Sequence, residues 1–264
     1  MNILDKIIEN KRREVAKSKL ERPEDILRKS DFFKFQPLSF REYLLRDDKN
    51  GIIAEYKRKS PSKGVINNTT NVAEAIVGYT KYGASAISIL TDHDFFGGSL
   101  SDLNDHPSHE IPVLRKDFII DEYQLIESRS YGADIILLIA GCLDKNQVRT
   151  LAATAKDIGL NVLLEIHNIE EADHICDFID VVGVNNRDLK TFQVDVNRSV
   201  ELSESIPNHM LKISESGIDA IETIQLLKTK GYSGFLIGER FMREKDPVES
   251  FKNFSEALIQ NNEV

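Results

Sequence analysis

The sequence predicts an α/β fold, a single closed (βα)8 barrel preceded by a helical extension. The first observation is a fourfold repeat in which a helical stretch ends in glycine and runs directly into a β-rich block. Glycine just past a helix supplies the positive φ that other residues adopt at a cost. The second observation is eight short apolar segments at a mean spacing of about 26 residues, the length of a compact βα unit. We place the extension at residues 1–50 and the barrel at residues 51–264, in one domain.

The eight predicted strands are mostly continuous apolar runs, as expected for a parallel sheet that is covered on both faces. They begin near Ile52, Ala86, Ile111, Asp134, Leu160, Asp180, Met210 and Gly234. In the first strand, alternation places Ile53, Glu55 and Lys57 on one face, with Ala54 and Tyr56 on the other.

Helices are predicted between these strands. Asp121 with Gln124, and Asp144 with Gln147, have the spacing of a capping box, which satisfies free N–H groups in the first turn of a helix. An open doubly wound sheet is the structural alternative. That fold usually carries a G-x-G-x-x-G turn after its first strand, where this chain has KSPSKG.

The extension before the first strand contains two predicted helices. The first is amphipathic, with apolar residues at Ile3, Leu4, Ile7 and Ile8, and the second is opened by Ser39. The extension is either a plug over the bottom of the barrel or a flap near its active end, and the sequence leaves both open.

Composition and charge argue against several classes. The chain has 264 residues, 41% hydrophobic and 29% charged, which is ordinary for a globular protein. Its 34 Lys and Arg against 43 Asp and Glu give a net charge of −9, whereas nucleic-acid binding depends on surplus cations. No segment approaches the roughly 20 apolar residues of a membrane span, and a secretory signal is lacking.

Metal binding and disulfides are not expected. Cys142 and Cys176 form neither a disulfide framework nor a zinc motif, which favours a cytoplasmic protein. His106 and His109 have the spacing of two ligands on one helix, but proline interrupts them and no third ligand is near.

Charged and polar side chains stand where the predicted strands end, the end at which barrels of this class carry active sites. Five strands contribute the residues Glu55, Lys57, Lys116, Glu165, Asn185, Arg187 and Glu215. The three carboxylates and three cations sum to zero, so pairing offsets desolvation and neighbouring charges shift pKa values. A single polar residue at a strand end commonly does no more than contact solvent. Seven such residues gathered at one end of the barrel instead predict acid–base chemistry.

A phosphate site is predicted at the ends of the last two strands. Ser216 and Gly217 follow the seventh strand and Gly238 follows the eighth, positions at which barrels often bind phosphate through backbone N–H groups. Ser60 can add a hydroxyl. Ordinary turn chemistry is the alternative explanation for each glycine.

Two aromatic residues and a histidine give weaker signals. Phe96 and Phe118 follow the second and third strands, where they either form a wall of the mouth or pack in a lid. His167 stands two residues after Glu165. It either orients that carboxylate or relays a proton, or it is an ordinary surface or satisfied core histidine.

Segments at these strand ends resemble the indole-3-glycerol phosphate synthase family. The matching stretches, spread in order over residues 52–243, are IIAEYKRKSPSKG, SILTDHDFFGGSLSDL, PVLRKDFIID, LLEIHN, VGVNNRDLKTF, ISESGI and FLIGERFM. The resemblance implies a lyase of tryptophan biosynthesis that closes 1-(2-carboxyphenylamino)-1-deoxyribulose 5-phosphate to indole-3-glycerol phosphate, with loss of CO₂ and water. It also implies that no metal and no cofactor takes part.

The resemblance implies a role for each matching position. Lys116 corresponds to the principal general acid, Glu165 to its partner in proton removal, and Lys57 to a residue that positions the substrate and can act as an acid. The other positions correspond to groups that orient substrate and lysines (Glu55, Asn185, Glu215), to substrate and phosphate contacts (Ser60, Arg187, Ser216, Gly217, Gly238) and to the wall beside the aromatic ring (Phe96, Phe118).

Two expectations concern charge. Burial should lower the pKa of Lys116 toward the working pH, so that the ammonium can donate a proton. Glu239 stands where similar sequences often carry a small residue such as serine, and its carboxylate would repel a phosphate. We therefore expect Glu239 to point away and backbone N–H groups to make the contact.

Two other functions compete with this interpretation. Phosphoribosylanthranilate isomerase is expected to carry a cysteine base on its first strand, which here carries Glu55 and Lys57. A non-catalytic barrel would bind its ligand without turnover and would not need Lys116, Glu165 and Asn185 together. The expected partner is a phosphorylated small-molecule substrate, with no nucleic acid and no membrane, and we expect a monomer rather than an oligomer.

Overall fold

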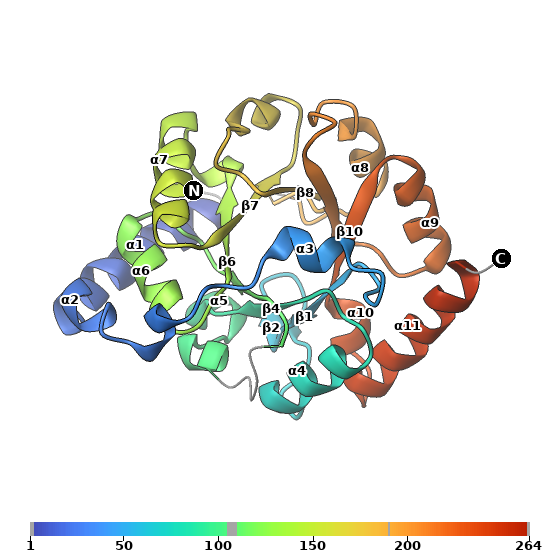
Figure 1. Ribbon diagram of the computed structural model, residues 1–264, viewed down its shortest axis with the longest axis horizontal. Helices are drawn as coiled ribbons and strands as arrows, with labels where there is room; N and C mark the ends of the chain where they lie inside the picture. The colour runs from blue at the N-terminus through green and yellow to red at the C-terminus, as the bar shows by residue number, and fades with distance from the viewer. Residues whose placement is uncertain (1–2, 105–109, 190, 263–264) are drawn as a thin grey trace.

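The computed structural model describes residues 3–104, 110–189 and 191–262, and its strands close into a parallel barrel (Figure 1). The order around the ring is β1, β4, β5, β6, β7, β8, β9 and β10, with β10 pairing back onto β1. The strands are β1 Ile52–Tyr56, β4 Ala86–Leu90, β5 Val113–Lys116, β6 Ile135–Ile139, β7 Asn161–Ile166, β8 Val181–Asn185, β9 Leu211–Glu215 and β10 Tyr232–Ile237. The predicted fold class is confirmed, and each predicted strand begins within about two residues of an observed one.

Helices follow the strands and surround the ring (Figure 1). They are α4 Val72–Lys81, α6 Glu122–Ser130, α7 Lys145–Asp157, α8 Asn197–Leu202, α9 Ile221–Thr229 and α11 Pro247–Asn262, with shorter turns at α5 His93–Phe96, η2 Leu100–Asn104, η3 Ala140–Cys142, η4 Glu170–His174 and α10 Glu239–Met242. The four glycines of the repeat follow α4, α6, α7 and α9, and each has a positive φ, as predicted. These turns return the chain to the ring at the start of each following strand.

The two predicted capping boxes differ in outcome. Asp144 and Gln147 form both reciprocal hydrogen bonds at the start of α7, which confirms that box. At α6, Asp121 instead accepts from the N–H of Tyr123, and Gln124 turns back to accept from Ile120. The spacing therefore predicted both helix starts, although the second start uses different partners.

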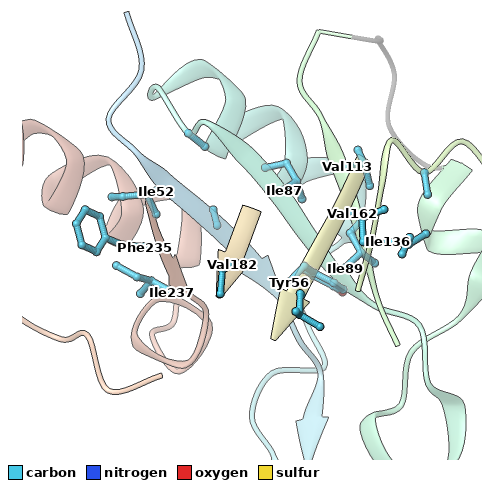
Figure 2. Packing of buried hydrophobic residues seen from close by; sticks show 14 of the residues in the cluster. Ile52, Tyr56, Ile87, Ile89, Val113, Ile136, Val162, Val182, Phe235 and Ile237 are labelled. Atoms are coloured by element: carbon cyan, nitrogen blue, oxygen red, sulfur yellow. The ribbon is translucent and has the colours of Figure 1, made fainter. Parts of the chain in front are cut away.

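Alternation along the strands separates two apolar layers. Ile53 faces into the barrel with residues such as Leu137 and Ile213, whereas Ala54 and Tyr56 face outward. The predicted separation of these residues onto two faces is confirmed. The outward side chains pack under the surrounding helices (Figure 2). Because apolar residues fill the ring, the polar residues of its inner face are left at the carboxyl ends of the strands.

The extension covers both ends of the barrel, so each of the two alternatives is correct for one part of it. It comprises α1 Ile3–Glu21, α2 Glu24–Leu27, η1 Asp31–Lys34 and α3 Phe40–Leu45. Helix α3 crosses the near end of the ring in Figure 1, where Phe40 and Leu44 pack on the inner residues of the barrel. The first turns of α1 lie at the opposite end, where Ile3, Leu4 and Ile7 line a cavity.

A small hairpin after β1 was not predicted. Strands β2 Lys59–Ser60 and β3 Gly64–Val65 pair antiparallel across the KSPSKG segment and the Val65 that follows it. Arg58, just before β2, forms an ion pair with Asp102 of η2. This contact holds the hairpin beside the carboxyl ends of the strands. Within the described ranges, the helices are too short or too polar to cross a membrane.

Candidate active site

A cavity of about 680 Å³ opens at the carboxyl ends of the strands. The structure brings all of the candidate site residues to its lining. They are Glu55, Lys57, Ser60, Phe96, Lys116, Phe118, Glu165, Asn185, Arg187, Glu215, Ser216, Gly217 and Gly238. Neighbouring strands of a closed parallel barrel end at the same rim, so residues far apart in the sequence meet there.

Lys116 lies between two carboxylates at the centre of the cavity. Its Nζ donates to Glu165 Oε2 at 2.7 Å and to Glu215 Oε2 at 2.5 Å. A second pair lies on β1 and the residue after it, where Lys57 Nζ donates to Glu55 Oε1 at 2.6 Å. The three carboxylates are at most 4% exposed, so these ion pairs are largely shielded from solvent.

Two glycines make room for the buried carboxylates. A Cβ at Gly183 of β8 would lie 2.3 Å from Glu215 Oε1, and a Cβ at Gly238 would lie 2.6 Å from Glu55 Oε1. Neither distance is sterically possible for a real side chain without movement. Gly238 is therefore required for the packing of Glu55, independently of any contact with phosphate.

The pKa values in the centre depend on mutual pairing. Burial lowers the pKa of Lys116, but the charges of Glu165, Glu215 and Glu55 outweigh burial and hold that pKa above its usual range. The expected lowering toward the working pH is therefore wrong. Burial raises the pKa of Glu165, yet Lys116 and His167 hold it well below its usual range. Glu215 differs, because burial and two like charges, opposed by Lys116, raise its pKa to about 7.

His167 belongs to the same network. Its Nε2 lies 3.1 Å from Glu165 Oε1, and its Nδ1 lies 3.2 Å from Glu171 Oε2. Burial lowers the pKa of His167, but the two carboxylates outweigh burial and raise it to about 9. The ring is therefore an imidazolium at neutral pH, and the sequence did not show the contribution of Glu171, which comes from η4.

The turn after β9 is strained and held in place. Ser216 has φ 71° and Gly217 has φ 73°, so two successive residues adopt the left-handed region. The buried Asn186 holds this turn, because its side chain donates to Ser216 O at 3.0 Å and its N–H donates to Glu215 O. Such strain persists only where the surroundings impose it, and it is typical of functional sites. Sequence reasoning missed Asn186.

The expectation that Glu239 points away is wrong. Its carboxylate lies 3.6 Å from Arg187 Nη2 and 3.6 Å from Lys63 Nζ, and all three residues line the cavity. Attraction to two cations lowers the cost of placing a carboxylate in the cavity. Lys63 of the hairpin turn is a second residue that sequence reasoning missed.

The aromatic pair and the N-terminal helix form another wall of the cavity. The rings of Phe96 and Phe118 have centroids 6.2 Å apart and are tilted by 40°. Ile3, Leu4 and Ile7 of α1 line the cavity too. In the described ranges, no group of three or more His, Cys, Asp or Glu side chains could hold a metal ion. His106 and His109 lie outside those ranges.

A closed parallel barrel, with lysines and carboxylates gathered where its strands end, defines a (βα)8-barrel enzyme. The family model described as indole-3-glycerol phosphate synthase matches residues 4–254, and the chain belongs to this family. It is thus a decarboxylating lyase of tryptophan biosynthesis that acts on a phosphorylated small molecule. The resemblance noted at the strand ends is confirmed.

Similar chains agree with this placement. Indole-3-glycerol phosphate synthase of Bacteroides thetaiotaomicron is 45% identical over 97% of this chain and 99% of its own length. The enzyme of the same name from Salinibacter ruber is 42% identical over 95% of this chain and 94% of its own length. These matches extend along almost the whole of both chains.

More distant solved structures show the fold alone. 3-Hexulose-6-phosphate synthase from Salmonella typhimurium superposes with a TM-score of 0.62 at 11% identity, over 80% of this chain and 99% of that one. The tryptophan synthase alpha subunit from Legionella pneumophila gives a TM-score of 0.61 at 13% identity, over 85% of this chain and 97% of that one.

Proposed function

We propose that the charged cavity carries out the ring closure of 1-(2-carboxyphenylamino)-1-deoxyribulose 5-phosphate, with the acid and base supplied by Lys116 and Glu165. The observation that carries this proposal is the placement of Lys116 Nζ between the carboxylates of Glu165 and Glu215. An ammonium and a carboxylate in direct contact supply the donor and the acceptor that the reaction needs within one site.

Lys116 acts first, as the general acid. The arene carbon attacks C2′ of the ketose, and the carbonyl oxygen gains the electron pair that leaves the C=O bond. An alkoxide is a stronger base than an amine, so Lys116 can protonate this oxygen even though its pKa is raised. Loss of CO₂ then restores conjugation of the ring.

Dehydration follows and needs both partners again. Glu165 removes one proton from the ring-closed intermediate, and a lysine protonates the departing hydroxyl. That lysine is either Lys57, which still carries its proton, or Lys116 after it has regained one. Glu55 holds Lys57 at 2.6 Å, and Asn185 and Glu215 border the same space. These three residues orient the substrate and the lysines.

The remaining lining residues bind the two ends of the substrate. Ser60, Arg187, Ser216, Gly217 and Gly238 receive the phosphate, and local cations must attract it because the net charge of the protein is −9. Phe96 and Phe118 contact the anthranilate ring.

Glu165→Gln tests the assignment of the base. The amide keeps the shape of the side chain but cannot accept the proton, so we expect kcat to fall about 10²-fold with KM within a few-fold of the parent value. Formation of indole-3-glycerol phosphate, followed by its fluorescence, measures both constants. A variant with near-normal kcat would remove Glu165 from the mechanism.

We further propose that the chain acts as a single domain and as a cytoplasmic monomer. The extension packs at both ends of the barrel, and one chain supplies all of the cavity lining described above. Cys142 and Cys176 are free thiols, which is typical of a reducing compartment.

A further inference from the structure

Glu165 is held by a different cation at each of its two oxygens. Oε2 accepts from Lys116 Nζ at 2.7 Å, and Oε1 lies 3.1 Å from His167 Nε2. Among the described residues, these are the two cationic side chains within ion-pair distance of Glu165. The carboxylate is 2% exposed, so solvent contributes little to its stabilisation.

His167 is itself fixed from behind by Glu171. Glu171 Oε2 accepts the backbone N–H of His167 at 2.7 Å and lies 3.2 Å from His167 Nδ1. Asn168 donates to the other oxygen, Glu171 Oε1, at 2.9 Å. The imidazole is thus held between carboxylates from β7 and η4.

The charged state of His167 follows from its surroundings. The carboxylates of Glu165 and Glu171 face the ring and raise its pKa to about 9. Cys142 of η3 lies near the same carboxylates, but burial and their charges raise its pKa, so it stays a neutral thiol. The ring therefore carries a positive charge across the neutral range.

We propose that His167 is a positioning residue that keeps Glu165 ionised and directed at Lys116 until Glu165 acts as the base, including the step in which Lys116 is neutral. The inference rests on the proposed roles of Lys116 and Glu165. When Lys116 gives its proton to the ketose oxygen, Glu165 loses one cation and is left beside the carboxylate of Glu215. Like charges raise a carboxylate pKa. The charge of His167 offsets that rise, and His167 itself transfers no proton.

The test is the pH profile of His167→Gln. Glutamine keeps an N–H near the position of Nε2 but carries no charge. We expect kcat to fall about tenfold, KM to stay within about twofold, and the acid limb of the kcat profile to move upward by about one pH unit. A uniform loss of kcat with an unmoved acid limb would show a merely structural role and overturn the proposal.

Three further variants keep the test decisive. His209→Gln changes an exposed histidine and should leave the profile unchanged. His167→Asn, which also removes the charge but carries a shorter amide, should move the acid limb in the same direction, and it carries the test if His167→Gln does not fold. If Glu165→Gln is inactive while both His167 variants keep the parent acid limb, only the inference about His167 fails. If Glu165→Gln is active, the proposed role of Glu165 fails instead.

Discussion

Lys116→Ala is expected to lower kcat by between about 10² and 10⁴-fold, the range for loss of one general acid. The ammonium is the proton donor placed in contact with Glu165 and Glu215, and alanine leaves both carboxylates without it. Substrate binding should largely persist, because the proposed contacts of the phosphate and the aromatic ring lie in other parts of the cavity. Steady-state kinetics, together with binding of the substrate measured by calorimetry, separates the two effects.

Folding must be controlled in that experiment. Removing one partner of a buried ion pair leaves uncompensated charge, which typically costs about 3–5 kcal/mol. Glu165 and Glu215 can take up protons in the variant, so its circular dichroism should be compared with that of the parent. Lys156→Ala, which removes a partly exposed lysine from a surface pair with Asp180, is the matched control and should leave kcat unchanged. Near-normal turnover by Lys116→Ala would contradict the acid role.

Lys11→Met is expected to lower the free energy of unfolding by about 3–5 kcal/mol, the usual cost of breaking a buried ion pair. Lys11 is 3% exposed, and its Nζ lies 3.0 Å from Asp92 Oδ2 and 3.0 Å from Asp117 Oδ1. Burial lowers the pKa of Lys11, but the two aspartates outweigh burial and raise it. Burial raises the pKa of Asp117, but Lys11 and Arg115 hold it below its usual range. Methionine keeps the length of the side chain but leaves Asp92 without the cation of Lys11 and Asp117 with that of Arg115, at 3.0 Å.

The same substitution should weaken catalysis, because Lys11 connects α1 to the segment that carries Lys116 and Phe118. Asp117 follows Lys116 directly and also accepts the N–H of Phe118 at 2.8 Å. Urea unfolding measures the stability, and steady-state kinetics measures the activity. Arg13→Met on the same helix, whose partner Glu9 is exposed, should change stability by less than about 0.5 kcal/mol. If both variants lower the free energy of unfolding equally, the buried ion pairs of Lys11 contribute no more to stability than an exposed pair does.

The barrel itself could be predicted because its signals are local. Each repeat glycine marks a helix end that needs positive φ, and alternation in β1 assigned Glu55 and Tyr56 to opposite faces from the strand alone. Barrel geometry then places all strand ends at one rim, which is why residues as distant as Lys57 and Gly238 were predicted to share a site.

Interactions between distant segments could not be predicted in the same way. Lys11 lies in a highly charged helical stretch, and such a sequence predicts an exposed helix face. Its burial is apparent only once α1 has packed against the barrel. Burial lowers the pKa of Lys116 and neighbouring carboxylates raise it, so the direction of the shift depends on how close those carboxylates lie. The contacts of 2.5 and 2.7 Å, which make attraction the stronger effect, are visible only in the folded structure. Glu239 was misjudged for the same reason, since its partner Lys63 lies on a hairpin that the sequence did not indicate.

The most direct test of the account is the rate of indole-3-glycerol phosphate formation by the intact protein, measured by fluorescence with and without excess EDTA. If the side chains of the cavity supply the acid and the base, as the family resemblance implies, turnover should be the same in both conditions. Folded protein that binds the substrate but does not turn it over would contradict the acid and base roles assigned to Lys116 and Glu165. Turnover that disappears with EDTA would show instead that a metal ion takes part.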